Sequence, residues 1–370
     1  MKYRLVNPEL NSPYLENLLR ERGVEDVKEY IKPTQNYLND PAKLDNIEKG
    51  AELYLNVIKH NGNILIVVDS DCDGFTSATI IYQYTKKIAP EIKISYLLHE
   101  GKQHGLQDHI DTILDKGDSY DLIILPDSSS NDYKYHEQLK DIHIPALVLD
   151  HHLTDVEISD NAVVINNQLS KNYPNKELTG AGVTYQFCRY IDNLLKVDYA
   201  DYFMDLAAWG IIGDMGSVLE MENRYIIEKG LSNIHNFFFQ TLIDKQSYSM
   251  NDKVNSTTVA FYIVPLINAM IRVGTMEEKE RLFGAFIDGT KKVSSNKRGA
   301  KGTEELLAVE SARECTNAKN RQNKIKDNAV DSLEAKIYKL GLIDNKVLFV
   351  RLDDDDDFPS ELNGSTKLAR

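Results

Sequence analysis

The stretch ILIVVDSDCDGFTSATIIYQY, residues 64–84, decides the fold of this chain. It opens with an apolar run, and three alternating carboxylates follow directly, Asp69, Asp71 and Asp73. Gly74 comes next, and the apolar residues after it recur at helical spacing. A continuous apolar run that passes through a polar turn into a helix is typical of a buried strand in a parallel sheet. The three carboxylates therefore stand where such a strand ends.

The same alternation of strand and helix continues along the chain. Apolar runs predict strands at residues 63–69, 93–99, 121–127, 145–152 and 162–168. The segments between and after them predict helices at residues 76–89, 106–117, 131–141 and 180–195. This alternation predicts an α/β fold in which helices flank both faces of a parallel sheet. In such sheets, ligands bind beyond the carboxyl ends of the strands.

A chain of 370 residues is long enough for more than one domain. We expect a helical N-terminal segment at 1–60, the α/β core at 61–217, a helical extension at 218–303, a connector helix at 304–340, and the start of a second α/β domain at 341–370. The Ser-, Lys- and Gly-rich residues 294–303 predict a loop. The run Asp353–Asp357 is expected to be a solvated loop, because consecutive side chains point in different directions.

The composition is that of an ordinary globular protein, with 42% hydrophobic and 27% charged residues. We find no apolar run that approaches a membrane span, and the N-terminus lacks the apolar centre of a signal peptide. The cysteines, Cys72, Cys188 and Cys315, are few and far apart. This pattern argues against a disulfide framework and against a cysteine zinc site, and it favours a reducing cytoplasm.

The net charge of −14 argues at first against a nucleic-acid partner. The charge is uneven, however, because residues 291–326 hold ten lysines and arginines against four glutamates, which leaves about −20 elsewhere. A basic surface for nucleic acid and a merely solvated helix and loop are about equally supported by this pattern.

Other predicted elements also end in acids or imidazoles. Asp127 ends LIILPDSSS, ALVLDHHLTD supplies Asp150, His151 and His152, and Asp214 follows the apolar run in WGIIGDMG. The carboxyl ends of parallel strands share one edge, and several ionised carboxylates gathered there require a cation. Oxygen ligands with one or two imidazoles suit Mn²⁺ or Mg²⁺. Two such ions can clamp a phosphoryl group and activate a water for in-line attack.

Each of these features has a simpler interpretation when it is taken alone. An isolated aspartate after a strand, such as Asp127, is more often a turn residue or a helix cap. A pair of histidines is often structural or solvated. The aspartates of residues 69–73 with Gly74 also suggest a calcium loop, but that loop needs a later glutamate and flanking helices, whereas a strand precedes the run here. The conjunction of all these groups at one edge favours the metal site.

Four segments resemble, in order, the motifs of the DHH phosphoesterase superfamily: VVDSDCDGFTSA (67–78), LPDSSS (125–130), LDHH (149–152) and GIIGDMG (210–216). The finer resemblance is to the RecJ-like single-strand-specific 5′→3′ exonucleases. It rests on LTGAGVTYQF (178–187), DMGSVLEMENRYIIEKGL (214–231), PLINAMIRVG (265–274) and TNAKNRQNKI (316–325). The resemblance extends from about residue 15 to the chain end and implies a DHH-type core that leads into a DHH-associated domain.

The resemblance implies a role for each acid and imidazole. Those that would bind or support two Mn²⁺ or Mg²⁺ ions are Asp69, Asp71, Asp73, Asp127, His151 and Asp214. Among them Asp127 would bridge the ions, and Asp71 and Asp73 are stronger ligand candidates than Asp69, because the chain turns within this segment. His152 would contact the scissile phosphate, and Asp150 would orient the imidazoles.

The resemblance also implies substrate-binding residues. Arg272 matches an arginine placed near the 5′ phosphate of the nucleic acid, although without the resemblance a surface ion pair is the better interpretation. His104 stands where a tyrosine is usual, and its ring could stack on a base. Lys297 and Arg298 in the predicted loop and Arg321 on the connector helix would follow the strand's backbone.

The chain departs from the family pattern at several positions. The usual arginine before Gly-Tyr-Gly is missing from YLLHEGKQHGL, Asn166 and Asn167 replace Asn-Pro, and serines follow Asp127 where glycine is common. The chain also ends before the Gly-rich motif of the DHH-associated domain and before any oligonucleotide-binding fold. We therefore expect a fragment of a longer protein, or a missing part supplied by another chain, from a divergent, phage-type relative.

The leading hypothesis is a metal-dependent 5′→3′ exonuclease on single-stranded DNA in recombination, repair or replication. Its candidate partners are a single-strand-binding protein or a helicase, with no membrane, and its oligomeric state is left open. The first alternative keeps the metal site but acts on short oligonucleotides, cyclic dinucleotides or pyrophosphate. The second is a non-catalytic nucleic-acid-binding relative with a degenerate site, which the presence of every acidic and histidine motif position argues against.

Overall fold

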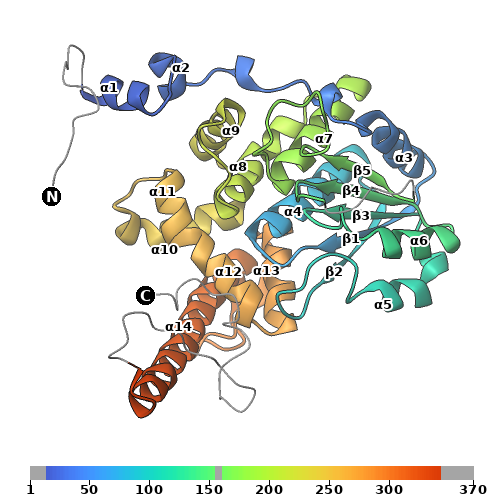
Figure 1. The fold of residues 1–370 in the computed structure, drawn as a ribbon. Coiled ribbons are helices and arrows are strands. Elements are labelled where there is room, and N and C mark those ends of the chain that lie inside the picture. The colour runs from blue at the N-terminus through green and yellow to red at the C-terminus, as the bar shows by residue number, and fades with distance from the viewer. Residues whose placement is uncertain (1–13, 155–160, 343–370) are drawn as a thin grey trace.

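A computed structural model of the chain describes residues 14–154 and 161–342. Within these residues, parallel strands form a central sheet in the order β2-β1-β3-β4-β5 (Figure 1). The strands are β1 Asn63–Val68, β2 Lys93–Leu98, β3 Leu122–Pro126, β4 Ala146–Asp150 and β5 Val163–Asn166. This arrangement confirms the predicted α/β fold. The order also sets the carboxyl ends of β1, β3 and β4 side by side.

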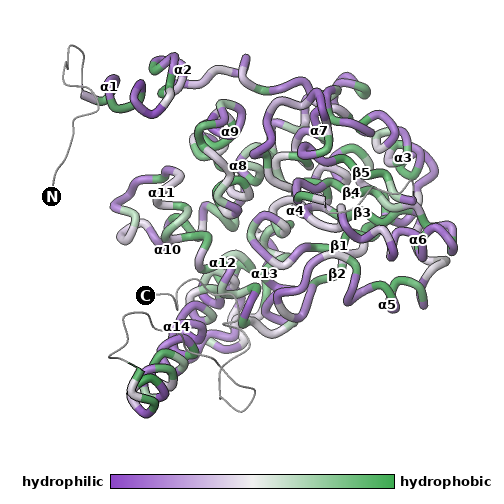
Figure 2. The backbone as a smooth tube through the Cα atoms, in the orientation of Figure 1, coloured by the Kyte–Doolittle hydropathy of each residue, from purple (hydrophilic) through white to green (hydrophobic). Residues whose placement is uncertain are grey.

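Alternate side chains of each strand enter separate apolar layers on the two faces of the sheet, as the two-residue period of a strand requires. In β1, Ile64 and Ile66 belong to one buried cluster, and Leu65 and Val67 belong to the other. Figure 2 shows the strands as mostly hydrophobic segments. The first layer contains α3 Ile47–Lys59, α4 Cys72–Ile88 and α7 Gly180–Leu195, and the second contains α5 Ile110–Asp115 and α6 Tyr133–Asp141.

The segment after the sheet is mainly helical, as the sequence predicts. The helices are α8 Met204–Gly213, α9 Met221–Ser232, α10 Phe237–Met250, α11 Ser256–Thr258, α12 Val264–Val273, α13 Met276–Asp288 and α14 Leu307–Lys339, with a π-helical turn at Val259–Ile263. Two short helices, α1 Tyr14–Glu21 and α2 Val27–Ile31, precede the core. Figure 1 shows α14 extending away from α12 and α13. Its first half is anchored, because Ala308, Ala312 and Cys315 are buried.

Two local expectations differ from the structure. Residues expected to form a loop and the start of a helix instead include an antiparallel hairpin, β6 Lys292–Ser294 and β7 Glu304–Leu306, so that the long helix begins only at Leu307. Such short, polar strands leave no apolar alternation in the sequence. The helix expected at 106–117 is shortened to α5, because the backbone of Leu106 is drawn into a turn by Asp132. The domain division remains a prediction, and Asp353–Asp357 lies outside the described residues.

The expectation that no segment approaches a membrane span is wrong for Ser256–Val273. This stretch of 18 residues has a mean hydropathy of 1.4, which meets the criterion of length and composition. About 44% of it is buried inside the structure. Its inner residues, including Ile267 and Met270, belong to the main apolar cluster. The stretch is therefore accounted for as a core helix that packs against other helices.

Candidate metal centre

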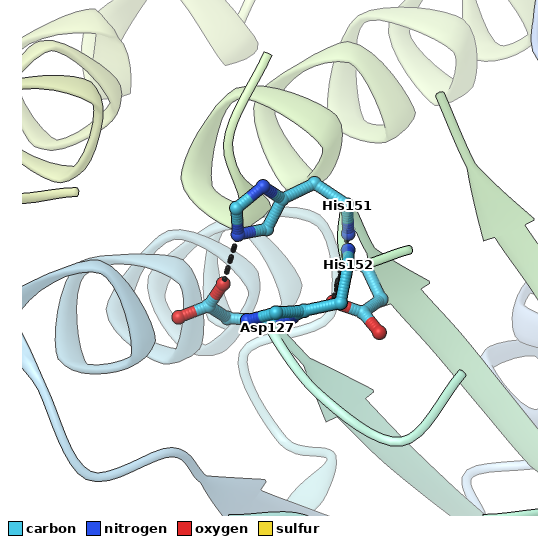
Figure 3. A group of neighbouring side chains, drawn as sticks. Asp127, His151 and His152 are labelled. Carbon is cyan, nitrogen blue, oxygen red and sulfur yellow. Dashed lines mark hydrogen bonds and ion pairs between the residues drawn. The ribbon is translucent and has the colours of Figure 1, made fainter. Parts of the chain in front are cut away.

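Among the acids and imidazoles singled out in the sequence, those that line one cleft of about 770 Å³ are His104, Asp150, His151, His152 and Asp214. Asp69, Asp127 and Asp150 stand at the carboxyl ends of β1, β3 and β4. Asp214 joins them from the end of α8, and both histidines after β4 also line the cleft. Figure 3 shows His151 extending toward Asp127 while His152 stays close to the β4 end. The sheet order thus brings together residues that are widely separated in the chain.

Asp127 lies in contact with His151, which lines the cleft, and its backbone is constrained. Its φ of 66° lies in the left-handed region, where a non-glycine residue is uncommon. The side chain is buried, and its Oδ1 lies 3.2 Å from Nε2 of His151 but has no hydrogen bond of good geometry among the described residues. The start of α7 lies so close that a Cβ at Gly180 would be only 2.4 Å from this oxygen. A buried carboxylate with an unsatisfied oxygen and a left-handed backbone indicates a functional position.

His151 faces three carboxylates at once. Its Nε2 lies 3.2 Å from Oδ1 of Asp127, 3.6 Å from Oδ2 of Asp214 and 4.0 Å from Oδ2 of Asp73. One ring nitrogen cannot donate to all three oxygens. The arrangement is the one expected of side chains that converge on a shared cation.

Asp150 fixes the orientation of His152. One of its oxygens, Oδ1, accepts hydrogen bonds from Nδ1 of His152 at 2.7 Å and from the backbone N–H of His151 at 2.7 Å. The other, Oδ2, accepts from the backbone N–H of Ser130 at 3.0 Å. The hydrogen bond to Asp150 raises the pKa of His152 to about 9, despite the opposing effect of burial. Burial alone would raise the pKa of Asp150, but its hydrogen bonds, first of all the one with His152, lower it below its usual range.

The three aspartates after β1 have different surroundings. Asp71 caps α4 by accepting from the backbone N–H of Gly74 at 3.0 Å. Asp73 is occupied at the start of α7, where it accepts three hydrogen bonds, from the Thr179 hydroxyl and the backbone N–H groups of Gly180 and Ala181.

Asp69 keeps an unpartnered oxygen. Its Oδ2 lies 2.7 Å from Nδ1 of His104, whereas its Oδ1 has no hydrogen bond from any residue between 14 and 154 or between 161 and 342. The donor atoms of Asp69, Asp71 and Asp127 lie within 4.8 Å of one another. The geometry therefore favours Asp69 over Asp73 as a ligand, whereas the sequence ranked Asp73 higher.

The clustered carboxylates raise one another's pKa. Burial first, and then the charges of Asp73, Asp71 and Asp69, raise the pKa of Asp127 well above its ordinary value. Burial raises the pKa of both Asp69 and Asp214 to about 6. Buried carboxylates that repel one another in this way can all stay ionised only if a positive charge lies among them. Oxygen donors with one imidazole fit Mn²⁺ or Mg²⁺, so the residues present fit the expected metal.

The raised pKa values predict how stability depends on pH and metal. Between pH 4 and 6 the folded, metal-free protein binds more protons than the unfolded chain, because the pKa of Asp69 and Asp214 is about 6 rather than 3.8. Its stability should therefore fall as pH rises through this window. At pH 7.5, Mn²⁺ at 100 times its Kd should add about 2.7 kcal/mol of stability. Thermal unfolding with and without Mn²⁺ at pH 5 and 7.5 measures both effects.

The control for this prediction lies on the same strand as Asp127. Asp121 stands at the opposite end of β3, where its side chain accepts from the backbone N–H of Asn63. Asp121→Asn should retain the Mn²⁺ response, whereas Asp127→Asn should raise the metal-free melting temperature at pH 7.5 and lose the response. An equal response in both variants would place the metal elsewhere.

The predicted substrate-binding residues divide into two groups. His104 lines the cleft. The described lining of the cleft does not include Arg272, Lys297, Arg298 or Arg321. Arg321 is held by Glu278 at 2.7 Å, and Lys297 and Arg298 lie in the exposed hairpin loop.

The basic segment, residues 291–326, is also partly neutralised by glutamates within the segment itself. Arg313 pairs with Glu305 at 2.6 Å, and Lys292 pairs with Glu304 at 2.9 Å.

Sequence reasoning gave no role to Glu222, which organises one wall of the cleft. Its buried carboxylate accepts hydrogen bonds from the Tyr173 hydroxyl at 2.9 Å and from the side-chain amide of Asn175 at 2.9 Å. Asn223, the next residue, donates to the carbonyl oxygens of Glu177 and Ser217. Glu177 lines the cleft, so this network holds its backbone in place. A signal existed in the sequence, because helical spacing puts Glu222 on the same face as Ile226, a buried position.

Asn167, which stands where the family has proline, also has a defined role. Its side-chain amide donates to the carbonyl oxygens of Asn175 at 3.2 Å and Leu178 at 3.1 Å. The hydrogen bonds of the Asn167 side chain to the neighbouring loop thus take the place of the rigid backbone that proline would give.

The chain is similar in sequence to known proteins. Residues 63–211 match the model of the DHH family, N-terminal domain. The chain is 38% identical over 356 residues to YorK of Bacillus subtilis (strain 168), a prophage-derived protein whose name ascribes to it a single-strand DNA-specific exonuclease activity, with 95% of this chain and 61% of that protein covered. It is 27% identical over 270 residues to the single-stranded-DNA-specific exonuclease RecJ of the same organism, with 71% and 33% covered.

The fold is also similar to a solved structure. The crystal structure of RecJ from Thermus thermophilus in complex with Mn²⁺ matches with a TM-score of 0.67 and 19% identity, over 85% of this chain and 43% of that one. The chain spans about three fifths of the length of the prophage relative, 61%, and less of the RecJ proteins.

Proposed function

Because residues 63–211 match the model of the DHH family, we propose that this chain is a metal-dependent exonuclease that hydrolyses the phosphodiester bonds of single-stranded DNA from the 5′ end. The observation that carries the proposal is the place of Asp127 in two groups of potential ligands. It gathers with Asp69 and Asp71 on one side and with the residues of the β4 end on the other. One carboxylate between two such groups is suited to bridge two ions.

Two divalent ions would be held around this bridge. Asp69 and Asp71 would complete one position, and His151 with Asp214 the other, supported by the contacts of His151 described above. When bound, Mn²⁺ or Mg²⁺ ions supply charge for the phosphate oxygens and make a water more acidic. Asp73 would act indirectly, by fixing the start of α7 against Asp127.

His152 would contact the scissile phosphate. Its ring is about half exposed and lines the cleft, and its Nδ1 is already engaged by Asp150 at 2.7 Å. With a pKa of about 9, the imidazole is protonated at neutral pH and can donate to a phosphate oxygen. Asp150 would keep it in that orientation, and the negative charge that develops on the phosphate in the transition state would be stabilised by this donor.

Arg272 is a candidate for the 5′ phosphate of the strand. Asn268, one helical turn before it on α12, accepts from the backbone N–H of Cys72 at 3.0 Å, so this face of α12 lies against the start of α4. The Nε of Arg272 is buried and has no hydrogen-bond partner among the residues that the structure describes. A guanidinium with an unused donor near the acidic cluster suits a phosphate group.

A single strand is the proposed substrate because its bases are free to stack. His104 presents a half-exposed ring at the cleft, anchored by Asp69 at 2.7 Å. Unpaired bases stack on such rings, whereas paired bases cannot. Lys297 and Arg298 would contact the backbone farther from the cleft.

The test is direct hydrolysis by the purified chain with Mn²⁺. We expect mononucleotides from 5′-phosphorylated single-stranded DNA, and little release from the matching duplex. Release from a cyclic dinucleotide or a short oligoribonucleotide, but not from long DNA, would instead support the alternative substrates. Absence of hydrolysis of all of these would contradict the proposed activity.

A further inference from the structure

The end of α8 has an unusual residue in a special position. Asp214 ends the helix, and Met215 follows with a φ of 60°, in the left-handed region. The backbone N–H of Met215 donates to the carbonyl of Ile212 at 3.3 Å, and that of Gly216 donates to the carbonyl of Ile211 at 2.8 Å. This pair of hydrogen bonds is the Schellman motif, in which glycine usually takes the left-handed position.

The stability of the helix end does not explain why methionine rather than glycine stands at this position. A side chain with a Cβ is disfavoured in the left-handed region, whereas glycine adopts it freely. A buried side chain could offset that cost, but Met215 is 87% exposed among the described residues. The helix would therefore end equally well, or better, with glycine. The side chain at Met215 requires another explanation.

The side chain stands at the rim of the proposed active site. Met215 lines the cleft beside Asp214, a proposed metal ligand. Leu153 lines the same cleft directly after His152, and its side chain is 75% exposed. Its carbonyl accepts from the side chain of Asn131 at 3.0 Å, which fixes the backbone there. Two exposed apolar side chains on anchored backbones thus flank the residues that would take the scissile phosphate.

We propose that Met215 and Leu153 form an apolar contact for the nucleobases on either side of the scissile phosphate. This inference rests on the proposed function and adds to it how the substrate is positioned. A site with metal-binding carboxylates at its base and apolar side chains at its edge fits a nucleotide. The phosphate would face the metal-binding residues, and the flat base would face the apolar side chains. A methionine thioether packs against aromatic rings of different shape, so the contact would not depend on base identity.

The proposal is tested by removing either the side chain or the bases. Met215→Gly is compared with the parent protein, both carrying Asp127→Asn to prevent hydrolysis, by fluorescence anisotropy with two 5′-phosphorylated single-stranded oligodeoxynucleotides. One is normal, and the other is abasic at its first two positions. We expect Met215→Gly to weaken binding of the normal oligonucleotide by about threefold to tenfold. Binding of the abasic oligonucleotide should not change.

A matched control exists at the end of α7. Lys196 also follows a helix with a left-handed φ of 57°, is exposed, and is not among the described residues that line the cleft. Lys196→Gly and Met215→Gly should both raise the melting temperature of the protein. Only Met215→Gly should weaken the binding of the normal oligonucleotide, and Leu153→Ser should act in the same direction on binding.

The outcomes separate the inference from the proposed function. Equal weakening of both oligonucleotides by Met215→Gly would overturn the base contact while leaving the nuclease proposal in place. A lowered melting temperature in Met215→Gly would overturn the argument that the methionine is not there for stability. If wild-type protein neither binds nor hydrolyses single-stranded DNA, the proposed function fails, and the inference fails with it.

Discussion

Replacing Asp127 by asparagine should reduce Mn²⁺-dependent hydrolysis of single-stranded DNA by at least about 10³-fold. Asparagine keeps the size of the side chain and tolerates the left-handed backbone at this position, so the fold should survive. The substitution removes the one negative charge that both proposed metal positions share. The expected loss is therefore in kcat at saturating metal, and the rate of mononucleotide release measures it.

The comparison variant is Asp121→Asn. Asp121 and Asp127 bracket the same strand, β3, but Asp121 lies at the edge of the sheet away from the cleft. We expect Asp121→Asn to retain at least about half of the wild-type activity, since exposed polar changes rarely affect a distant site. Substantial hydrolysis by Asp127→Asn would show that the metal centre lies elsewhere in the chain.

The second large effect is expected at His152. His152→Ala should lower kcat by about 10² to 10³-fold, because it removes a donor aimed at charge that develops in the transition state. KM should change far less. In the proposed mechanism the protonated imidazole is the active form, so the activity of the wild type should fall as pH rises through the pKa of His152, which is about 9 in the metal-free protein.

Asp150→Asn tests the origin of that pKa. The hydrogen bond to Asp150 is the main cause of the raised pKa, so its loss should move the alkaline fall of the activity toward lower pH. His60→Ala is the control, because His60 is exposed and its ring is hydrogen-bonded within its own helix, to the carbonyl of Asn56 at 2.8 Å. A pH profile that Asp150→Asn leaves in place would assign the titration to another group.

The sheet could be predicted from the sequence because each of its strands is a continuous apolar run. β1, β3 and β4 are buried along nearly their whole length, as continuous apolar runs between helices require in a parallel sheet. The convergence of Asp127 and His151 followed from the same prediction, since parallel strands end at one edge, whereas Asp214 reaches them from the end of α8. The hairpin β6–β7 could not be predicted, because its strands are only three residues long and carry lysines and glutamates.

The different surroundings of Asp69 and Asp73 also lay beyond the sequence. The sequence analysis expected the chain to turn after Val68, but it could not show where the side chains would then lie, with α4 beginning at Cys72. Asp73 then meets the start of α7, more than a hundred residues later, and its oxygens are used there. Contacts of this kind depend on tertiary packing. The same applies to Arg321, whose charge is neutralised by Glu278 on α13.

The strand order has a consequence for how the candidate metal centre forms. β1 lies between β2 and β3, so Ile64 must pair with Leu122 across an intervening strand and two helices. Non-local pairings of this kind are reached late, because a long loop must close before any contact compensates for the lost entropy. Asp69 and Asp127, which follow these two strands, meet only at that step, where the repulsion between their carboxylates opposes closure. The candidate metal centre also needs His151 after β4 and Asp214 after α8, so it forms only together with the folded core.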